Sequence, residues 1–134
     1  MDVKLTLGED KGYVATNTRG VSIRLGAGLA DGPSPMELVL MAVGGCSGVD
    51  IVSILEKMRQ PLRGFEIQVS GERMEEHPRY FHKIRIKYVV EGEVEEDKLI
   101  RAINLSLDKY CSVSNGLIPK ADISYEYEIR GDSN

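Results

Sequence analysis

The sequence contains no tryptophan, and only two cysteines and two histidines among its 134 residues. Two cysteines are too few for a disulfide-stapled scaffold or for a four-thiolate zinc site. Neither His77 nor His82 has a third ligand nearby in the sequence, so we do not expect a zinc site that includes the cysteines. Cys46 and Cys111 are therefore either two inert core residues or a redox couple.

The chain also lacks an excess of positive charge. Its formal net charge is −4 and its calculated pI is about 5.2, with lysine and arginine scattered among acidic residues. Phosphate backbones are bound by clustered basic side chains, so a nucleic-acid partner is not expected. The N-terminus lacks the basic segment and apolar stretch of a secretion signal. We expect a cytoplasmic protein with one domain over residues 1–134.

The first quarter of the chain predicts three short strands, at residues 3–7, 13–16 and 21–25. Glycine, asparagine and aspartate dominate the turns between them, and these residues tolerate positive φ angles. An antiparallel meander is the expected result. A flexible, glycine-rich stretch then leads into the next element.

A long apolar helix is predicted from Ser34 to Arg59. Ser34 and Glu37 form a capping-box pattern, and Pro61 follows the end of the helix. From Leu38 to Leu55, Asp50 is the only charged residue. That charge and the glycines in the run argue against a membrane-spanning segment.

The soluble alternative has a consequence for assembly. A helix that is apolar all round must be buried all round, and one small sheet covers only one side of it. A second copy of the chain is the simplest cover for the other side, so we predict an obligate homodimer.

The second half predicts two alternating strands, a helix and a final strand. The strands are expected around residues 65–69 and 84–90, joined by a long hairpin. The helix opens near residue 95, with Leu99, Ile103, Ser106 and Tyr110 along one stripe, and a break follows from residue 111. A last strand covers residues 123–129, and the whole order is typical of an α+β fold.

Three segments taken together resemble the OsmC/organic-hydroperoxide-resistance superfamily, in particular its uncharacterised short bacterial branch. They are Pro33-Ser34-Pro35-Met36-Glu37-Leu38 running into Gly44-Gly45-Cys46, then His77-Pro78-Arg79-Tyr80-Phe81, then Ser106 through Lys109-Tyr110-Cys111-Ser112-Val113. The resemblance extends from about Met1 to Ile129.

The resemblance implies an OsmC-like, intertwined homodimer with the long helices at its centre. It implies that Cys46 is the peroxidatic thiolate, which attacks an organic hydroperoxide and becomes a sulfenic acid. Cys111 would then resolve the sulfenic acid as a disulfide, which an external dithiol reduces. It implies no metal and no organic cofactor, and the charge distribution and the composition of the long helix argue against a nucleic-acid or a membrane partner.

Attack by Cys46 requires a thiolate, and a nearby cation favours that form. The resemblance implies an arginine from the N-terminal strands, for which Arg24 is the first candidate and Arg19 the second. It also implies a glutamate just after the helix-opening proline. Met36 occupies that position and Glu37 follows it, one residue or about 100° further round the helix.

Each of these supporting residues has a plainer interpretation. Glu37 completes the capping box with Ser34, Arg24 is a charge at the end of a strand, and we expect a structural role for Asp50.

A non-catalytic alternative keeps the same fold. Met36 in place of the expected acid is compatible with a dimeric protein that binds a small apolar or thiol-containing ligand in its interface pocket. A structural partner for another protein has no sequence feature in its favour.

Overall fold

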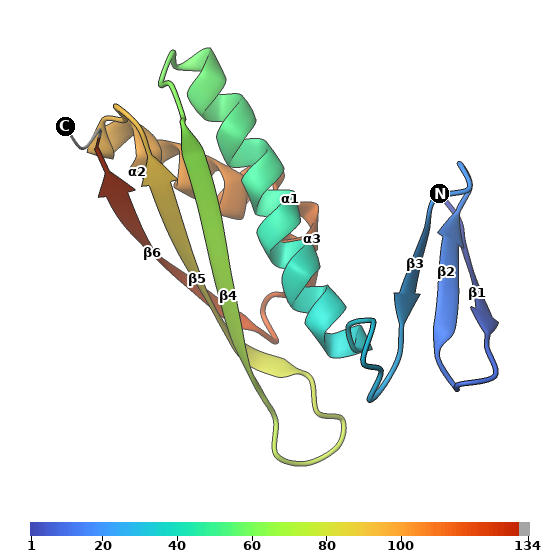
Figure 1. Cartoon of the computed structure of the whole chain (residues 1–134). Helices are drawn as coiled ribbons and strands as arrows, with labels where there is room; N and C mark the ends of the chain where they lie inside the picture. The colour runs from blue at the N-terminus through green and yellow to red at the C-terminus, as the bar shows by residue number, and fades with distance from the viewer. Residues whose placement is uncertain (132–134) are drawn as a thin grey trace. The chain divides into compact units, whose positions relative to one another are not determined.

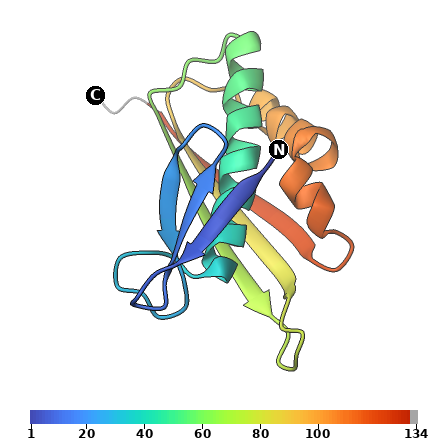
Figure 2. The same ribbon diagram turned by 90° about the vertical axis from the view of Figure 1, so that its right-hand side faces the viewer.

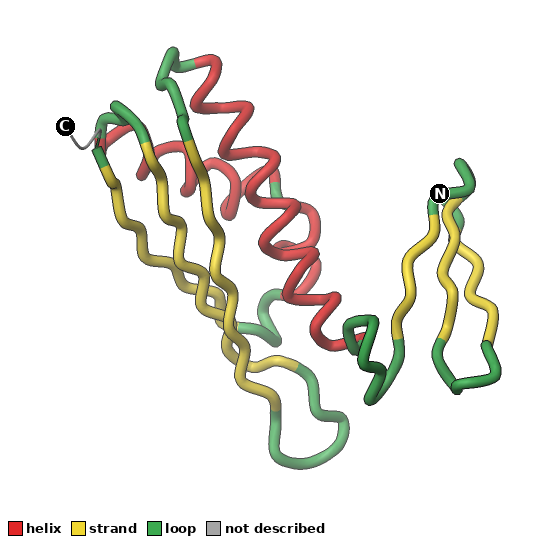
Figure 3. Tube along the Cα trace, viewed as in Figure 1, coloured by secondary structure: helices red, strands yellow, loops and turns green. Residues whose placement is uncertain are grey.

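The computed structural model describes residues 1–131, which form two compact units, residues 1–39 and residue 40 onward. The fold is α+β, as the sequence predicts (Figures 1 and 3). In chain order the elements are β1 (Val3–Leu7), β2 (Tyr13–Asn17), β3 (Ser22–Leu25), α1 (Pro35–Lys57), β4 (Gly64–Arg73), β5 (Phe81–Glu91), α2 (Glu96–Leu105), the π-helical segment η1 (Ser106–Tyr110), α3 (Ser112–Leu117) and β6 (Asp122–Arg130).

The first unit contains the predicted antiparallel meander, with the strand order β1-β2-β3. The β1–β2 turn is closed by the Gly8 N–H, which donates to the Gly12 carbonyl at 2.7 Å. In the β2–β3 turn the Asn17 side chain accepts from the N–H groups of Arg19 and Val21. These local bonds explain why the turn residues alone predict the meander.

Helix α1 begins in the predicted capping box. The Glu37 N–H donates to Ser34 Oγ at 3.1 Å, and the Ser34 N–H donates to Glu37 Oε1 at 2.9 Å. The helix ends in a Schellman motif, because Arg59 has a φ of 59° and the Gln60 N–H donates to the Leu55 carbonyl. The helix therefore ends at Lys57, two residues before the predicted end at Arg59, and the chain reverses its direction at Arg59.

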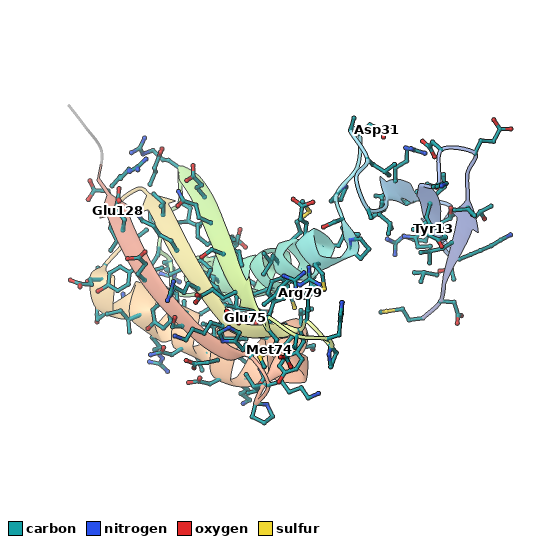
Figure 4. All side chains as sticks on the ribbon, turned by 90° about the horizontal axis from the view of Figure 1, so that it is seen from below. Tyr13, Asp31, Met74, Glu75, Arg79 and Glu128 are labelled. Carbon is teal, nitrogen blue, oxygen red and sulfur yellow. The ribbon has the colours of Figure 1, made fainter. Side chains whose placement is uncertain are left out.

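The second unit contains a mixed sheet with the strand order β4-β5-β6. Strands β4 and β5 are antiparallel, and β6 pairs with β5 in parallel. The loop between β4 and β5 carries Met74, Glu75 and Arg79 (Figure 4). It is closed by the Met74 N–H, which donates to the Tyr80 carbonyl, and by Arg79 Nε, which donates to the Met74 carbonyl.

The helices of this unit cover one face of its sheet (Figures 1 and 2). The other face is charged, with ion pairs such as Lys87–Glu128. The core consists mainly of aliphatic side chains and includes Val43, Ile51, Leu55, Ile84, Ile86, Val90, Leu99 and Ile103. Helix α1 has the length and composition of a membrane span, as core helices also do. Here Val43, Ile51 and Leu55 are fully buried inside the protein.

Two details differ from the sequence-based expectation. The predicted break after residue 110 contains a further short helix, α3. Tyr110 does not share the buried stripe of Leu99, Ile103 and Ser106, because it is 50% exposed. The π-helical turn at Ser106–Tyr110 inserts one residue, which rotates the side chains that follow away from the α-helical phase.

Gly92 provides a test of the close packing at the end of β5. Its φ is 137°, and a Cβ atom there would lie 2.5 Å from the carbonyl oxygen of Pro61. We expect Gly92→Ala to lower the free energy of unfolding by roughly 1–3 kcal/mol. Gly116→Ala is the matched control, because nothing lies within 4 Å of the added methyl. Urea unfolding monitored by circular dichroism measures both; equal stability of the two variants would contradict this packing.

Candidate functional site

Cys46 lies in the middle of α1, where the helix approaches β4 most closely. A Cβ on Gly44 would lie 3.1 Å from Val69, and one on Gly48 would lie 2.6 Å from Ile67. A larger residue at either position would have to displace these side chains, and glycine avoids this at some cost to helix propensity. Cys46 itself is half-buried and free.

Cys111 lies between the π-helical segment and α3 and is fully buried. Its N–H donates to the Ser106 carbonyl at 2.6 Å, and its carbonyl accepts from Asn115 Nδ2 at 2.9 Å. Its sulfur caps α3, accepting from the Ser114 N–H at 3.4 Å, and lies 3.1 Å from Ser114 Oγ. The thiol is therefore held by both segments that flank it.

The structure brings the two cysteines together, although 64 residues separate them in the sequence. The Cys46 thiol is near enough to Cys111 to affect its pKa. Burial raises the pKa of the Cys111 thiol, the bonds from Ser114 oppose this, and Cys46 raises it further. Its burial therefore favours the protonated form of the Cys111 thiol.

A buried hydroxyl pair joins α1 to β5 beside the thiols. The Tyr88 hydroxyl donates to Ser47 Oγ at 2.7 Å, and Ser47 Oγ donates in turn to the Val43 carbonyl at 2.8 Å. Burial raises the pKa of Tyr88 to about 12, with smaller contributions from Cys111 and Asp50. Those two residues therefore lie near the same phenol.

Asp50, the single charge within the apolar run, has a partner in the π-helical segment. Ser106 is fully buried, and its hydroxyl lies 3.1 Å from Asp50 Oδ2 and 3.4 Å from the Ser47 carbonyl. Asp50 also reaches a pocket of about 370 Å³. The other lining residues are Ser53, Ile54, Lys57, Met58, Leu105 and Tyr110.

The other predicted site residues belong to the first unit. Arg24 Nη2 lies 2.5 Å from Asp10 Oδ2, and Arg24 Nε lies 2.9 Å from Asp31 Oδ2. These carboxylates raise the pKa of the Arg24 guanidinium. Glu37 accepts the capping bond described above. A role of Arg24, Arg19 or Glu37 toward the thiols stays a prediction.

Within residues 1–131, no three histidine, cysteine or acidic side chains are grouped so that they could hold a metal ion. His77 lies exposed in the β4–β5 loop and His82 lies on β5.

Sequence reasoning missed Tyr88 and Ser114 as neighbours of the thiols. Tyr88 fits the apolar alternation of its strand, so the pattern identifies it only as core. Ser114 lies in the predicted break. Ser47, beside Cys46 in an apolar helix, was the available signal that a buried hydroxyl partner exists.

The match to protein families covers both cysteines. The model of the family described as OsmC-like protein matches residues 28–126. The chain belongs to this family. The predicted resemblance is thereby confirmed.

Individual relatives agree with this assignment. Protein YhfA of Escherichia coli K12 is 46% identical over 98 residues, which cover 72% of this chain and 73% of that protein. The structure is similar to that of a hypothetical protein from Aquifex aeolicus, with a TM-score of 0.91, 37% identity, and coverage of 98% and 97% of the two chains. An organic hydroperoxide resistance protein from Legionella pneumophila shares the fold, with a TM-score of 0.71, 12% identity and coverage of 95% of each chain.

Tyr88 generates a pH-dependent prediction. Its pKa is about 12 in the folded protein against an ordinary value of 10.0, so the folded state binds this proton more tightly than the unfolded state. Its contribution to stability is complete below pH 10 and is lost as the pH rises toward 12. We expect the free energy of unfolding to fall more steeply over this range in the wild type than in Tyr88→Phe. Parallel slopes in urea unfolding experiments would contradict the assignment. Tyr125→Phe, which loses an exposed hydrogen bond to Asn104, is the control.

Proposed function

We propose that this protein is a thiol-dependent peroxidase-like redox protein that reduces organic hydroperoxides through Cys46 and Cys111. Membership in the OsmC-like family supports a role in redox chemistry or peroxide resistance. The observation that carries the finer proposal is the interaction between the two thiols in one largely buried site.

The first step oxidises Cys46. Its sulfur donates an electron pair to the terminal oxygen of the hydroperoxide, so an S–O bond forms and the O–O bond breaks. The alkoxide that leaves takes up the proton lost by the thiol and departs as an alcohol. Cys46 is left as a sulfenic acid.

The second step uses the neighbouring thiol. The Cys111 sulfur attacks Cys46, so an S–S bond forms, the S–O bond breaks, and the hydroxyl leaves as water with the Cys111 proton. The N–H and hydroxyl groups of Ser114 fix the position of the Cys111 sulfur. An external dithiol then reduces the disulfide and restores both thiols. A cytoplasmic location, where dithiols are kept reduced, is part of this proposal.

An apolar pocket lies near the pair, although neither cysteine is among its lining residues. The pocket at Asp50 opens one helical turn from Cys46, and Ile54, Met58 and Leu105 give it an apolar wall. Such a wall accommodates the organic group of a hydroperoxide better than hydrogen peroxide, which gains nothing from apolar contact.

Replacing either cysteine tests this chemistry. In the wild type, one equivalent of cumene hydroperoxide should remove both thiols and produce an intramolecular Cys46–Cys111 disulfide in the mass spectrum. Cys46→Ser should consume no peroxide, because no thiolate is left in the attacking position. Cys111→Ser should react once and accumulate oxidised Cys46. Unchanged peroxide consumption by Cys46→Ser would refute the proposal.

We also propose that two copies of the chain form the working protein. Met41 and Val49 lie on the side of α1 away from its buried residues and are 56% and 72% exposed. Between them, Gly45 is exposed, and nothing lies within 4 Å of the position its Cβ would take. An exposed apolar surface of this kind on a helix is typical of an interface.

Placing a charge on this surface tests the dimer. Val49→Lys would bury an unpaired ammonium group in the interface, so it should shift the protein from dimer to monomer in sedimentation at micromolar concentration. Asp108→Lys, an exposed position of the π-helical segment, adds the same side chain as a control and should remain dimeric. A wild-type monomer would overturn the prediction.

A second candidate function rests on a larger pocket. A pocket of about 630 Å³, largely open to solvent, lies near the end of α1. Its lining residues are Val52, Glu56, Arg59, Gln60, Pro61, Leu62, Arg63, Gly64 and Phe65. A non-catalytic protein that binds a small apolar or thiol-containing ligand would use such a space. Both thiols inert to peroxide, together with a ligand retained in native mass spectrometry, would favour this candidate.

A further inference from the structure

The oxidation of Cys46 requires a group that moves a proton. The thiol must lose its proton before it attacks, and the departing alkoxide must gain one. Near the pair, Tyr88 has a pKa of about 12 and donates its proton to Ser47, so it is a poor proton acceptor. Ser106 and Ser114 carry only hydroxyl groups. Asp50 supplies a carboxylate.

Asp50 lies where this task has to be done. It follows Cys46 by four residues on α1, so the two side chains are neighbours on one helix face. Ser106, fully buried, holds Oδ2 of Asp50 at 3.1 Å. Because Asp50 is only half-buried and lines the 370 Å³ pocket, a molecule bound there can contact it.

The same carboxylate adjoins the second thiol. Asp50 and Cys111 both act on the Tyr88 phenol, and the Ser106 residue that binds Asp50 accepts the Cys111 N–H through its carbonyl. A carboxylate in an otherwise apolar helix is costly unless it is hydrogen-bonded, and the Ser106 hydroxyl supplies such a bond to Asp50.

We propose that Asp50 is the general acid–base of the peroxide reaction. Its carboxylate accepts the proton from the Cys46 thiol. The thiolate then attacks the terminal oxygen of the hydroperoxide, the S–O bond forms and the O–O bond breaks. Asp50 returns the proton to the departing alkoxide, which leaves as an alcohol, so the carboxylate is regenerated. This role rests on the peroxidase-like function proposed above.

Other ionisable groups lie near Asp50. Lys57 of α1 and Tyr110 of the π-helical segment line the same pocket. Tyr88 of β5 and Cys111 complete the set, and Cys46 is the reaction partner.

Two rates measured on the full chain near neutral pH separate this role from a structural one. In Asp50→Asn, the rate of cumene hydroperoxide consumption should fall by roughly tenfold or more. A tenfold loss is small compared with the usual contribution of general acid–base catalysis to a rate. Alkylation of Cys46 by iodoacetamide, located by mass spectrometry, should be at least as fast as in the wild type. In the variant the Cys46 thiol can still lose its proton to water, and iodide leaves without needing a proton, so the step lost is the return of the proton to the alkoxide.

Matched variants complete the experiment. Ser106→Ala removes the hydrogen bond but keeps the carboxylate. Its rate of peroxide reduction should therefore stay within about threefold of the wild-type rate and well above that of Asp50→Asn. Asp50→Glu should recover part of the lost rate. Should Asp50→Asn fail to fold by circular dichroism, Asp50→Ala assayed with added formate replaces it, and formate should raise its rate.

Each outcome decides one question. Peroxide reduction by Asp50→Asn at the wild-type rate overturns the role of Asp50 and leaves the peroxidase-like function intact. Loss of both the peroxide and the alkylation rates overturns it as well, because a structural role then explains the defect. A wild type that consumes no more peroxide than Cys46→Ser refutes the function itself, and the role of Asp50 with it.

Discussion

The approach of α1 to β4 is the constraint on which the second unit depends. Gly44 and Gly48 let the helix backbone come so close to Ile67 and Val69 that no larger residue fits without displacement. At this separation Ser47 reaches the Tyr88 hydroxyl, which fixes the rotation of the helix about its axis. That rotation also sets the position of Cys46. Because Cys46 precedes the buried Ser47, its side chain points toward the edge of the contact between α1 and β4. Gly44 and Gly48, which have no side chain beyond hydrogen, thus help to position the Cys46 thiol.

Features determined by neighbours along the chain were accessible from the sequence. The capping box of Ser34 and Glu37 spans four residues, and the turns of the meander are closed by bonds within five residues. The parallel pairing of β5 with β6 was not accessible, because strand direction depends on the path of the intervening helices. The π-helical turn was also missed: an α-helical stripe through Tyr110 assumes a constant phase, which one inserted residue breaks.

The candidate site divides in the same way. The family resemblance singled out Cys46 and Cys111, but their contact depends on how the segment from Ser106 to Ser114 packs over α1. The bond between Tyr88 and Ser47 joins residues 41 apart and no local pattern encodes it. Arg24 shows the opposite limit. From the sequence, Arg24 was either the first candidate cation for the Cys46 thiolate or a strand-end charge, and only the structure reveals its ion pairs with Asp10 and Asp31.

The parallel ladder between β5 and β6 has a consequence for the order in which the chain folds. Antiparallel neighbours such as β4 and β5 can zip from their hairpin, whereas β6 needs the whole crossover through α2 and α3 to be in place first. Cys111 lies inside that crossover, and Cys46 lies in the part of the chain made earlier. During synthesis the two sulfur atoms therefore lie apart until the final strand has docked. The two thiols are therefore brought together late, and an incompletely made chain carries two separate thiols instead of a pair.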